Sequence, residues 1–126
     1  MPLRTRRWND PKLQGDGFRL LITRFRPRGL KKADETWDAW MKELGPSEEL
    51  HAAVYGKRGP KLKFLEYRER YLVEIAGQEE AIRALAKRSK AGEMITLLCS
   101  TACINEGRCH RTILAGLIEE AEKALP

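Results

Sequence analysis

Two short apolar runs most constrain what this chain can fold into. Residues 20–22 lie between a Gly-Asp-Gly turn and a Pro-Arg-Gly turn, and residues 94–98 follow an Ala-Gly pair. Apolar runs of this length, bounded by turn residues, are typical of strands buried on both faces of a parallel sheet. A third candidate strand ends at the Asn9-Asp10-Pro11 turn. The sequence therefore predicts strands at residues 3–8, 18–25 and 94–98.

The segments between these strands carry apolar residues at helical spacing. Helices are expected at residues 31–44, after Ser47 as a cap, and at residues 64–75, 78–90 and 112–125. Trp37 and Trp40 share the apolar face of the first of these helices, where core packing is expected and a stacking platform is the alternative. Helices set between buried strands predict one α/β domain over residues 1–126. Its sheet should be small and mostly parallel, with helices on both faces in three layers.

The charge distribution bounds the classes of partner. The net charge is +6, and residues 1–32 hold ten Lys or Arg and two Asp. Such a basic segment attracts anions, including nucleic acid, although surface charge also serves solubility and no aromatic stacking motif is interleaved with the arginines. No charge-free run is long enough to span a bilayer, and no apolar stretch follows the first arginines as in a signal peptide. A cytoplasmic protein that does not contact membranes is expected.

Two loops are expected at the carboxyl ends of the predicted strands, where parallel sheets bind ligands. The first covers residues 24–32 and contains Arg24 and Arg28, whose guanidinium groups suit phosphate or carboxylate. Ion pairs with Asp38 or Glu43 are the alternative for these arginines. The second loop covers residues 99–111 and contains Cys99, Cys103, Cys109, His110 and Arg111.

The same loops carry a family likeness. The motifs, in chain order, are Asp16-Gly17-Phe18-Arg19, Arg24, Pro27-Arg28-Gly29-Leu30-Lys31-Lys32, Trp40, Lys42-Glu43-Leu44, Pro46-Ser47, Glu49-Leu50 and Arg70-Tyr71, followed by Leu97-Leu98-Cys99 and Cys109-His110-Arg111. On these motifs the chain resembles, over nearly its whole length, the YeaO-like proteins of the domain-of-unknown-function 488 family. The resemblance implies an α/β fold and names no reaction. Thr23 and Arg26 depart from the family pattern, which commonly has an acidic residue and a Trp there.

A cysteine at the end of a buried strand, followed by a loop and a helix, suits thiolate chemistry. Backbone N–H groups at the helix start and nearby arginines would lower the pKa of the thiol and hold an anionic substrate. The candidate catalytic residues are therefore Cys99, Cys109 and His110, and the candidate anion-binding residues are Arg24, Arg28 and Arg111. The spacing of Cys to Arg matches no phosphatase loop. The alternatives are buried cysteines that only pack and a histidine exposed to solvent.

The three cysteines also admit a metal site. An odd number within residues 99–109 favours a local chemical or metal site over a disulfide framework. Cys99, Cys103, Cys109 and His110 would suffice for tetrahedral zinc. Against this, the Cys-x-x-Cys spacing is absent, and adjacent Cys109 and His110 would point apart on a helix. The leading interpretation therefore includes no metal and no cofactor.

The leading hypothesis is a pocket for a phosphate- or carboxylate-bearing small molecule, in which a chemical step is an open option. It expects Cys99, Cys109, His110 and Arg111 to lie near Arg24 and Arg28, around one cleft. The first rival is a nucleic-acid-binding module that uses the basic first 32 residues. The second rival is a metal-binding interaction protein.

Overall fold

The computed structural model describes residues 3–56, 59–100 and 109–126. Its elements along the chain are β1 (Leu3–Arg7), β2 (Phe18–Leu21), the 3-10 helix η1 (Lys32–Asp34), β3 (Ala39–Trp40), the 3-10 helix η2 (Lys42–Leu44), α1 (Glu48–Val54), α2 (Phe64–Ile75), the 3-10 helix η3 (Ala76–Gln78), α3 (Glu79–Lys90), β4 (Ile95–Cys99) and α4 (His110–Ala124). The three predicted strands and the helices after residue 47 are confirmed, with small shifts at their ends.

The four strands form one parallel sheet in the order β1-β4-β2-β3. The last strand in the sequence, β4, lies between β1 and β2, where Leu97 pairs with Thr5 on one side and with Leu20 on the other. All five residues of β4 are buried, as the uninterrupted apolar pattern predicts for a strand covered on both faces. The α/β fold expected from the sequence is therefore confirmed.

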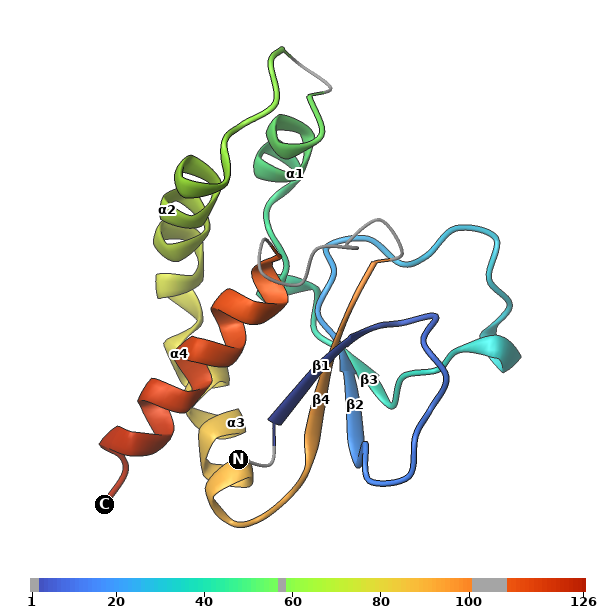
Figure 1. The fold of residues 1–126 in the computed structure, drawn as a ribbon, viewed down its shortest axis with the longest axis vertical. Coiled ribbons are helices and arrows are strands. Elements are labelled where there is room, and N and C mark those ends of the chain that lie inside the picture. Colours follow the sequence, from blue (N-terminus) through green and yellow to red (C-terminus); the bar gives the residue numbers. More distant parts are fainter. Residues whose placement is uncertain (1–2, 57–58, 101–108) are drawn as a thin grey trace.

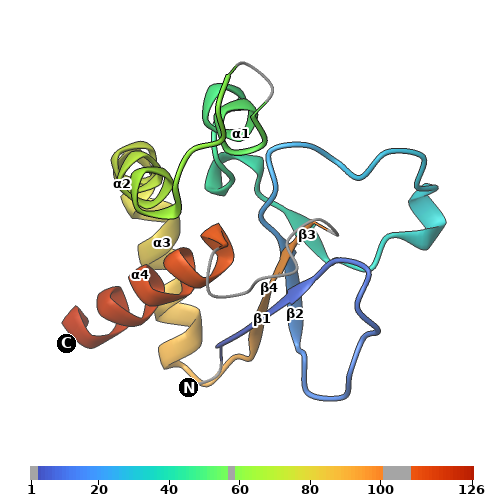
Figure 2. The same cartoon turned by 45° about the horizontal axis from the view of Figure 1, so that its top comes forward.

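The two faces of the sheet are covered differently. All four α-helices lie on one side (Figures 1 and 2), and their side chains form the core with Leu20, Ile22, Ile95 and Leu97. Neighbouring strand residues point to the opposite face, which the chain between β1 and β3 covers. On that side the helical structure is the short turn η1. The α-helices therefore cover one face of the sheet, and not both faces as in the expected three-layer arrangement.

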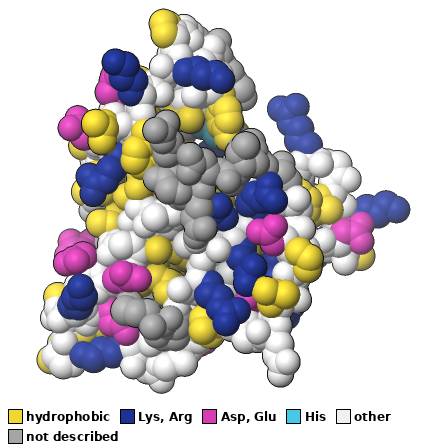
Figure 3. Space-filling view, viewed as in Figure 1, with side chains coloured by type: hydrophobic (Ala, Val, Ile, Leu, Met, Phe, Trp, Pro, Cys, Tyr) yellow, Lys and Arg dark blue, Asp and Glu magenta, His cyan; other side chains and the backbone are white. Residues whose placement is uncertain are grey.

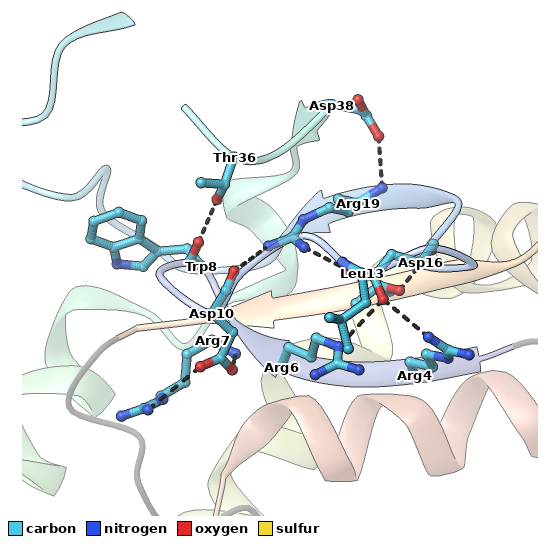
Figure 4. A network of polar contacts seen from close by, with 11 residues as sticks. Arg4, Arg6, Arg7, Trp8, Asp10, Leu13, Asp16, Arg19, Thr36 and Asp38 are labelled. Carbon is cyan, nitrogen blue, oxygen red and sulfur yellow. Dashed lines mark hydrogen bonds and ion pairs between the residues drawn. The ribbon is translucent and has the colours of Figure 1, made fainter. Parts of the chain in front are cut away.

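A buried ion cluster fastens the loop before β2 to this second face (Figure 4). The Asp16 carboxylate accepts a hydrogen bond at 2.7 Å from Arg19 and lies within 3.3 Å of both Arg4 and Arg6. The backbone carbonyl of Asp16 accepts a hydrogen bond from the Thr96 hydroxyl on β4. Asp16 and Arg19 are fully buried, so this part of the family motif has a structural role.

The predicted helix over residues 31–44 is wrong. In place of a helix, the segment contains two 3-10 turns and the edge strand β3. Its backbone bonds to β2 instead of to itself: Asp38 N–H donates to the Arg19 carbonyl, and Met41 N–H donates to the Leu21 carbonyl. The Asp38 carboxylate accepts from the Arg19 N–H in return. The segment forms these hydrogen bonds with the sheet and not a helix, because its Asp, Thr and Trp residues have weak helix propensity.

The two tryptophans of this segment consequently do not share a helix face. Trp37 packs edge-to-face against Trp8, with the Arg26 guanidinium over its ring. Trp40 lies on β3, and its indole N–H donates to the Thr23 carbonyl at 2.7 Å. Both rings therefore fasten the chain around β2, and Trp40 remains 38% exposed.

Candidate functional site

The candidate site lies at the carboxyl edge of the sheet, where β4 ends and α4 begins. Cys99 is the last residue of β4, Cys109 is the N-cap of α4, and His110 and Arg111 open that helix. All four residues are buried, with exposed fractions of 5% or less. Cys103 and Arg108 lie outside the described residues. In the part that is described, the structure brings Cys99, Cys109 and His110 together as the sequence suggested.

The two sulfur atoms and one ring nitrogen form a compact triangle. The Sγ atoms of Cys99 and Cys109 are 3.1 Å apart, and the His110 Nδ1 atom is 3.8 Å from the first and 3.9 Å from the second. Adjacent residues 109 and 110 were expected to point apart on a helix. They converge because Cys109 is extended, with φ −125° and ψ 147°, and only His110 is helical. Cys99 is a free thiol and Cys109 is disulfide-bonded.

A backbone carbonyl fixes the orientation of the His110 ring. The Nε2 atom lies 2.8 Å from the carbonyl oxygen of Ile22, just after β2. A carbonyl can only accept, so Nε2 carries the proton and the Nδ1 lone pair faces the two sulfurs. The Tyr71 ring packs edge-on against the imidazole at 5.6 Å, and its hydroxyl donates to the Leu44 carbonyl.

Burial dominates the protonation of both reactive groups. It raises the pKa of the Cys99 thiol to about 11, against the opposing effects of the Ser100 backbone and the Arg111 charge. Burial likewise lowers the pKa of His110 to about 4, although its hydrogen bond to Ile22 acts in the other direction. The low thiol pKa expected from the sequence is therefore not found at Cys99. At neutral pH the site holds a neutral thiol beside a neutral imidazole.

The charge of Arg111 nevertheless acts on the site. The Arg111 charge acts on both Cys99 and His110, and in each case it lowers the pKa. The first turn of α4 contains no acidic residue, and Cys109 makes no side-chain capping bond. The partial positive charge of this helix start is therefore not offset by a carboxylate of its own first turn.

The two arginines of the other loop lie in different surroundings. The Arg24 guanidinium donates to the Pro46 and Gly45 carbonyls at 3.0 and 3.3 Å, so it ties the chain after β2 to the chain before α1. Arg28 is exposed. Arg24 thus supports the segment that carries the Ile22 carbonyl, and Arg28 is accessible to solvent. That both arginines bind an anion together with Arg111 stays a prediction.

The basic residues that the nucleic-acid hypothesis uses are largely engaged within the chain. Arg4 and Arg6 contact Asp16, Arg7 contacts Asp10, and Arg26 contacts Glu35. Figure 3 shows Lys and Arg side chains on both halves of the visible face, with acidic side chains among them. Because Arg4, Arg6 and Arg19 share the one carboxylate of Asp16, these ion pairs offset only part of the positive charge that a phosphate backbone would meet.

Sequence reasoning missed the residues that orient His110. The Ile22 carbonyl is a backbone atom and has no side-chain signature. Tyr71 looked like one more apolar residue of α2. In the sequence, Gly45 indicated only the end of a helix. An added Cβ there would lie 2.9 Å from the backbone oxygen of Ile22 and 2.5 Å from the backbone nitrogen of Arg24. A glycine followed by proline at a strand edge was the one signal in the sequence for this close approach.

Comparison with known proteins decides the family. The family model described as the active DUF488-N3 subclade, DUF488-N3a, matches residues 3–122. The chain belongs to the DUF488 family. Within DUF488, it is 38% identical over 115 residues to the uncharacterized protein YeaO of Escherichia coli, covering 91% of this chain and 95% of YeaO. The YeaO-like assignment from the sequence motifs is thus confirmed.

More distant DUF488 relatives occur in mycobacteria. Uncharacterized proteins of Mycobacterium bovis and Mycobacterium tuberculosis are 29% identical over 103 residues, which is 82% of this chain and 81% of each relative. No solved structure matches the chain. Among the described residues, no helix has the length and apolar character needed to cross a bilayer.

Proposed function

We propose that this DUF488 protein is a thiol-dependent enzyme that acts on a small anionic molecule, with Cys99 as the nucleophile and His110 as the base. The observation that carries the proposal is the alignment of Cys99 Sγ, His110 Nδ1 and the Ile22 carbonyl, with the Nδ1 lone pair 3.8 Å from the sulfur. A nucleophile, a base and a group that orients the base form the arrangement used in nucleophilic catalysis. The description of the matching subclade as active supports an enzymatic role.

The protonation of the site determines the order of events. Because the resting thiol has a pKa of about 11 and the imidazole one of about 4, a preformed thiolate–imidazolium pair is disfavoured. The proton must move as the new bond forms. Cys99 Sγ attacks an electrophilic carbon while its proton passes to Nδ1. The leaving group then departs with its bonding electrons and takes the proton back from Nδ1. Throughout, the proton on Nε2 stays in place and is donated in a hydrogen bond to the Ile22 carbonyl.

The charge at the site supports an anionic substrate. Arg111 and the start of α4 place positive potential beside Cys99 without a carboxylate in the first helical turn. Exposed Arg28, on the loop after β2, is a candidate for the outer end of the same anion.

A pair of matched alkylating reagents tests this proposal. Iodoacetate and iodoacetamide have similar size and differ in charge, so their rate ratio at one thiol reports local potential independently of access. The labelling of Cys99 is followed by peptide mass spectrometry. The ratio of the iodoacetate rate to the iodoacetamide rate should be at least about threefold higher at Cys99 than at glutathione. Arg111→Gln should remove the preference and Arg111→Lys should retain it.

The role of His110 is tested by the same labelling. His110→Ala should slow the reaction of Cys99 with iodoacetamide by about tenfold or more at neutral pH, because no base then accepts the thiol proton. Glu120→Gln, at an exposed position of α4, is the control and should leave the rate unchanged. A charge preference equal to that of glutathione, together with no effect of His110→Ala, would overturn the proposed function.

A further inference from the structure

Three donor atoms of the site are arranged as ligands of a single ion. Cys99 Sγ, Cys109 Sγ and His110 Nδ1 all lie within 4.8 Å of one another. A tetrahedral zinc site with Zn–S of about 2.3 Å and Zn–N of about 2.0 Å needs S–S separations of roughly 3.8 Å and S–N separations of roughly 3.5 Å. The observed separations are 3.1, 3.8 and 3.9 Å. Shifts below about 1 Å would therefore complete the coordination geometry.

The histidine is already in the state that a metal requires. Its Nε2 proton is held by the Ile22 carbonyl, so Nδ1 offers a lone pair without losing a proton. Histidine ligands in metal sites commonly donate their other ring N–H to a backbone carbonyl or carboxylate, which fixes the ring.

The burial of the two sulfur atoms also favours cation binding. Cys99 is 2% exposed and Cys109 is 1% exposed. Two thiolates in such surroundings would be strongly disfavoured by themselves, but a divalent cation neutralises both. Two sulfurs and one imidazole also match the preference of zinc for soft and borderline ligands.

We propose that Cys99, Cys109 and His110 bind a Zn²⁺ ion once the disulfide of Cys109 has been reduced. A phosphine reductant supplies the two electrons and is converted by water into its oxide, while the disulfide becomes two thiols. Zn²⁺ then replaces the thiol protons of Cys99 and Cys109, so two protons are released, and His110 adds its Nδ1 lone pair. The described residues supply three ligands, and the fourth position is open to a further ligand.

The zinc site and the proposed nucleophile use the same sulfur. A Zn²⁺ ion bound to Cys99 occupies the electron pair with which the thiol would attack, so zinc and alkylating reagents should compete. The zinc site is a property beyond the proposed function. It is tested separately, because zinc affinity is measured without any anionic reagent.

The test uses Co²⁺ as a spectroscopic probe in the phosphine-reduced full chain. Tetrahedral Co²⁺ with thiolate ligands should give visible d–d bands and a sulfur-to-metal charge-transfer band, and Zn²⁺ should abolish both on displacing it. Zn²⁺ affinity is then obtained by competition with a chromophoric chelator. A pH indicator should record two protons released for each Zn²⁺ bound.

Matched variants assign the ligands. Cys99→Ala and His110→Ala should each weaken Zn²⁺ binding by more than about tenfold. The control Glu120→Gln, at an exposed position of α4, should leave it unchanged. The unreduced protein should bind Zn²⁺ far more weakly. Circular dichroism shows whether each variant folds. In the unaltered reduced chain, which needs no variant, Zn²⁺ should protect Cys99 and Cys109 from iodoacetamide.

Three outcomes would overturn the zinc site. They are the lack of a charge-transfer band in the reduced chain, equal Zn²⁺ affinity before and after reduction, and equal labelling of Cys99 and Cys109 with and without Zn²⁺. A charge preference in the alkylation assay could survive any of these results, so the two proposals can fail separately.

Discussion

At the scale of single residues, the best-supported feature is the buried ion cluster around Asp16. Burial alone would raise the pKa of this carboxyl, but the Leu13 N–H and the guanidinium groups of Arg6, Arg4 and Arg19 together lower it. Arg19 is fully buried, and it also donates to the Asp10 carbonyl at 3.2 Å. The charge of Asp16 is thus the counter-ion that makes a buried arginine tolerable in this sheet.

Replacement of Asp16 by Asn should destabilise the fold at neutral pH by about 3 kcal/mol, because it leaves the buried Arg19 without its counter-charge. The pKa of Asp16 is lowered in the folded state. Its contribution is therefore fully present above the ordinary value of about 3.9 and is lost as the pH falls below it. Urea unfolding at pH 7 and pH 3 measures both effects.

Glu120→Gln is the control for this measurement, since Glu120 is exposed and meets Lys123 only at 4.0 Å. It should change stability by less than about 0.5 kcal/mol. Equal stabilities of the Asp16→Asn variant and the unaltered protein at pH 7 would show that the cluster does not stabilise the fold.

The residue types in the sequence predicted which side chains form the candidate site, but not the pKa of its thiol. Cys99, Cys109 and His110 stood out because few side chains offer such chemistry, and they do lie together. The expected low thiol pKa depended on exposure, and Cys99 is buried. Whether charge or burial prevails at a thiol is decided by the packing of distant segments, which one sequence does not display.

At the scale of elements, the segment after β2 is held from one side by the chain before α1. Arg24 donates to the Gly45 and Pro46 carbonyls, and Tyr71 donates to the neighbouring Leu44 carbonyl. Gly45 allows the two backbones to meet, and its φ of −84° shows that contact, not backbone conformation, requires glycine here. This contact positions the Ile22 carbonyl under His110.

A methyl group at Gly45 should disturb both the fold and the site. Gly45→Ala places a Cβ 2.5 Å from the backbone nitrogen of Arg24 and 2.9 Å from the backbone oxygen of Ile22. It should therefore lower the free energy of unfolding by about 2 kcal/mol. It should also slow the labelling of Cys99, because the displaced carbonyl no longer orients His110. Denaturant unfolding and iodoacetamide kinetics measure the two effects.

Gly116→Ala is the matched control. Gly116 lies within α4 and has no atom within 4 Å of an added Cβ, so alanine should stabilise the helix by about 1 kcal/mol. Similar effects of the two substitutions would contradict a close-contact role for Gly45.

Elements were predictable from the sequence wherever local pattern and tertiary contact agreed. The apolar run of β4 and the helical spacing of α2, α3 and α4 are of this kind. The segment at residues 31–44 is not, because its helix-like apolar spacing competes with hydrogen bonds to β2 that only the assembled sheet offers. The position of β4 between β1 and β2 also arises from pairing across 70 or more residues.

At the scale of the whole molecule, His110 couples the stability of the fold to pH. Its pKa falls to about 4 because the folded chain buries the ring as a neutral group. An unfolded chain binds that proton near pH 6.5, so acid favours unfolding from there downward. This window lies above the one in which Asp16 acts, and the two contributions can be separated.

The unfolding free energy should therefore fall by on the order of 3 kcal/mol between pH 6.5 and pH 4 through His110 alone. The His110→Gln variant, measured by urea unfolding with a chelator present, should show a shallower pH dependence by that amount. Glu120→Gln should keep the dependence of the unaltered protein, because Glu120 is exposed. The same slope in the His110→Gln variant would refute the assignment.

The parallel sheet leaves β1 at one edge, and three of its five residues are arginines. A strand from another molecule that approached this edge would meet a row of like charges, and β3 at the opposite edge is only two residues long. Open sheet edges are where folded chains start to join into aggregates. We therefore expect the arginines that hold the Asp16 loop on one side of the sheet also to oppose strand pairing between copies of the protein.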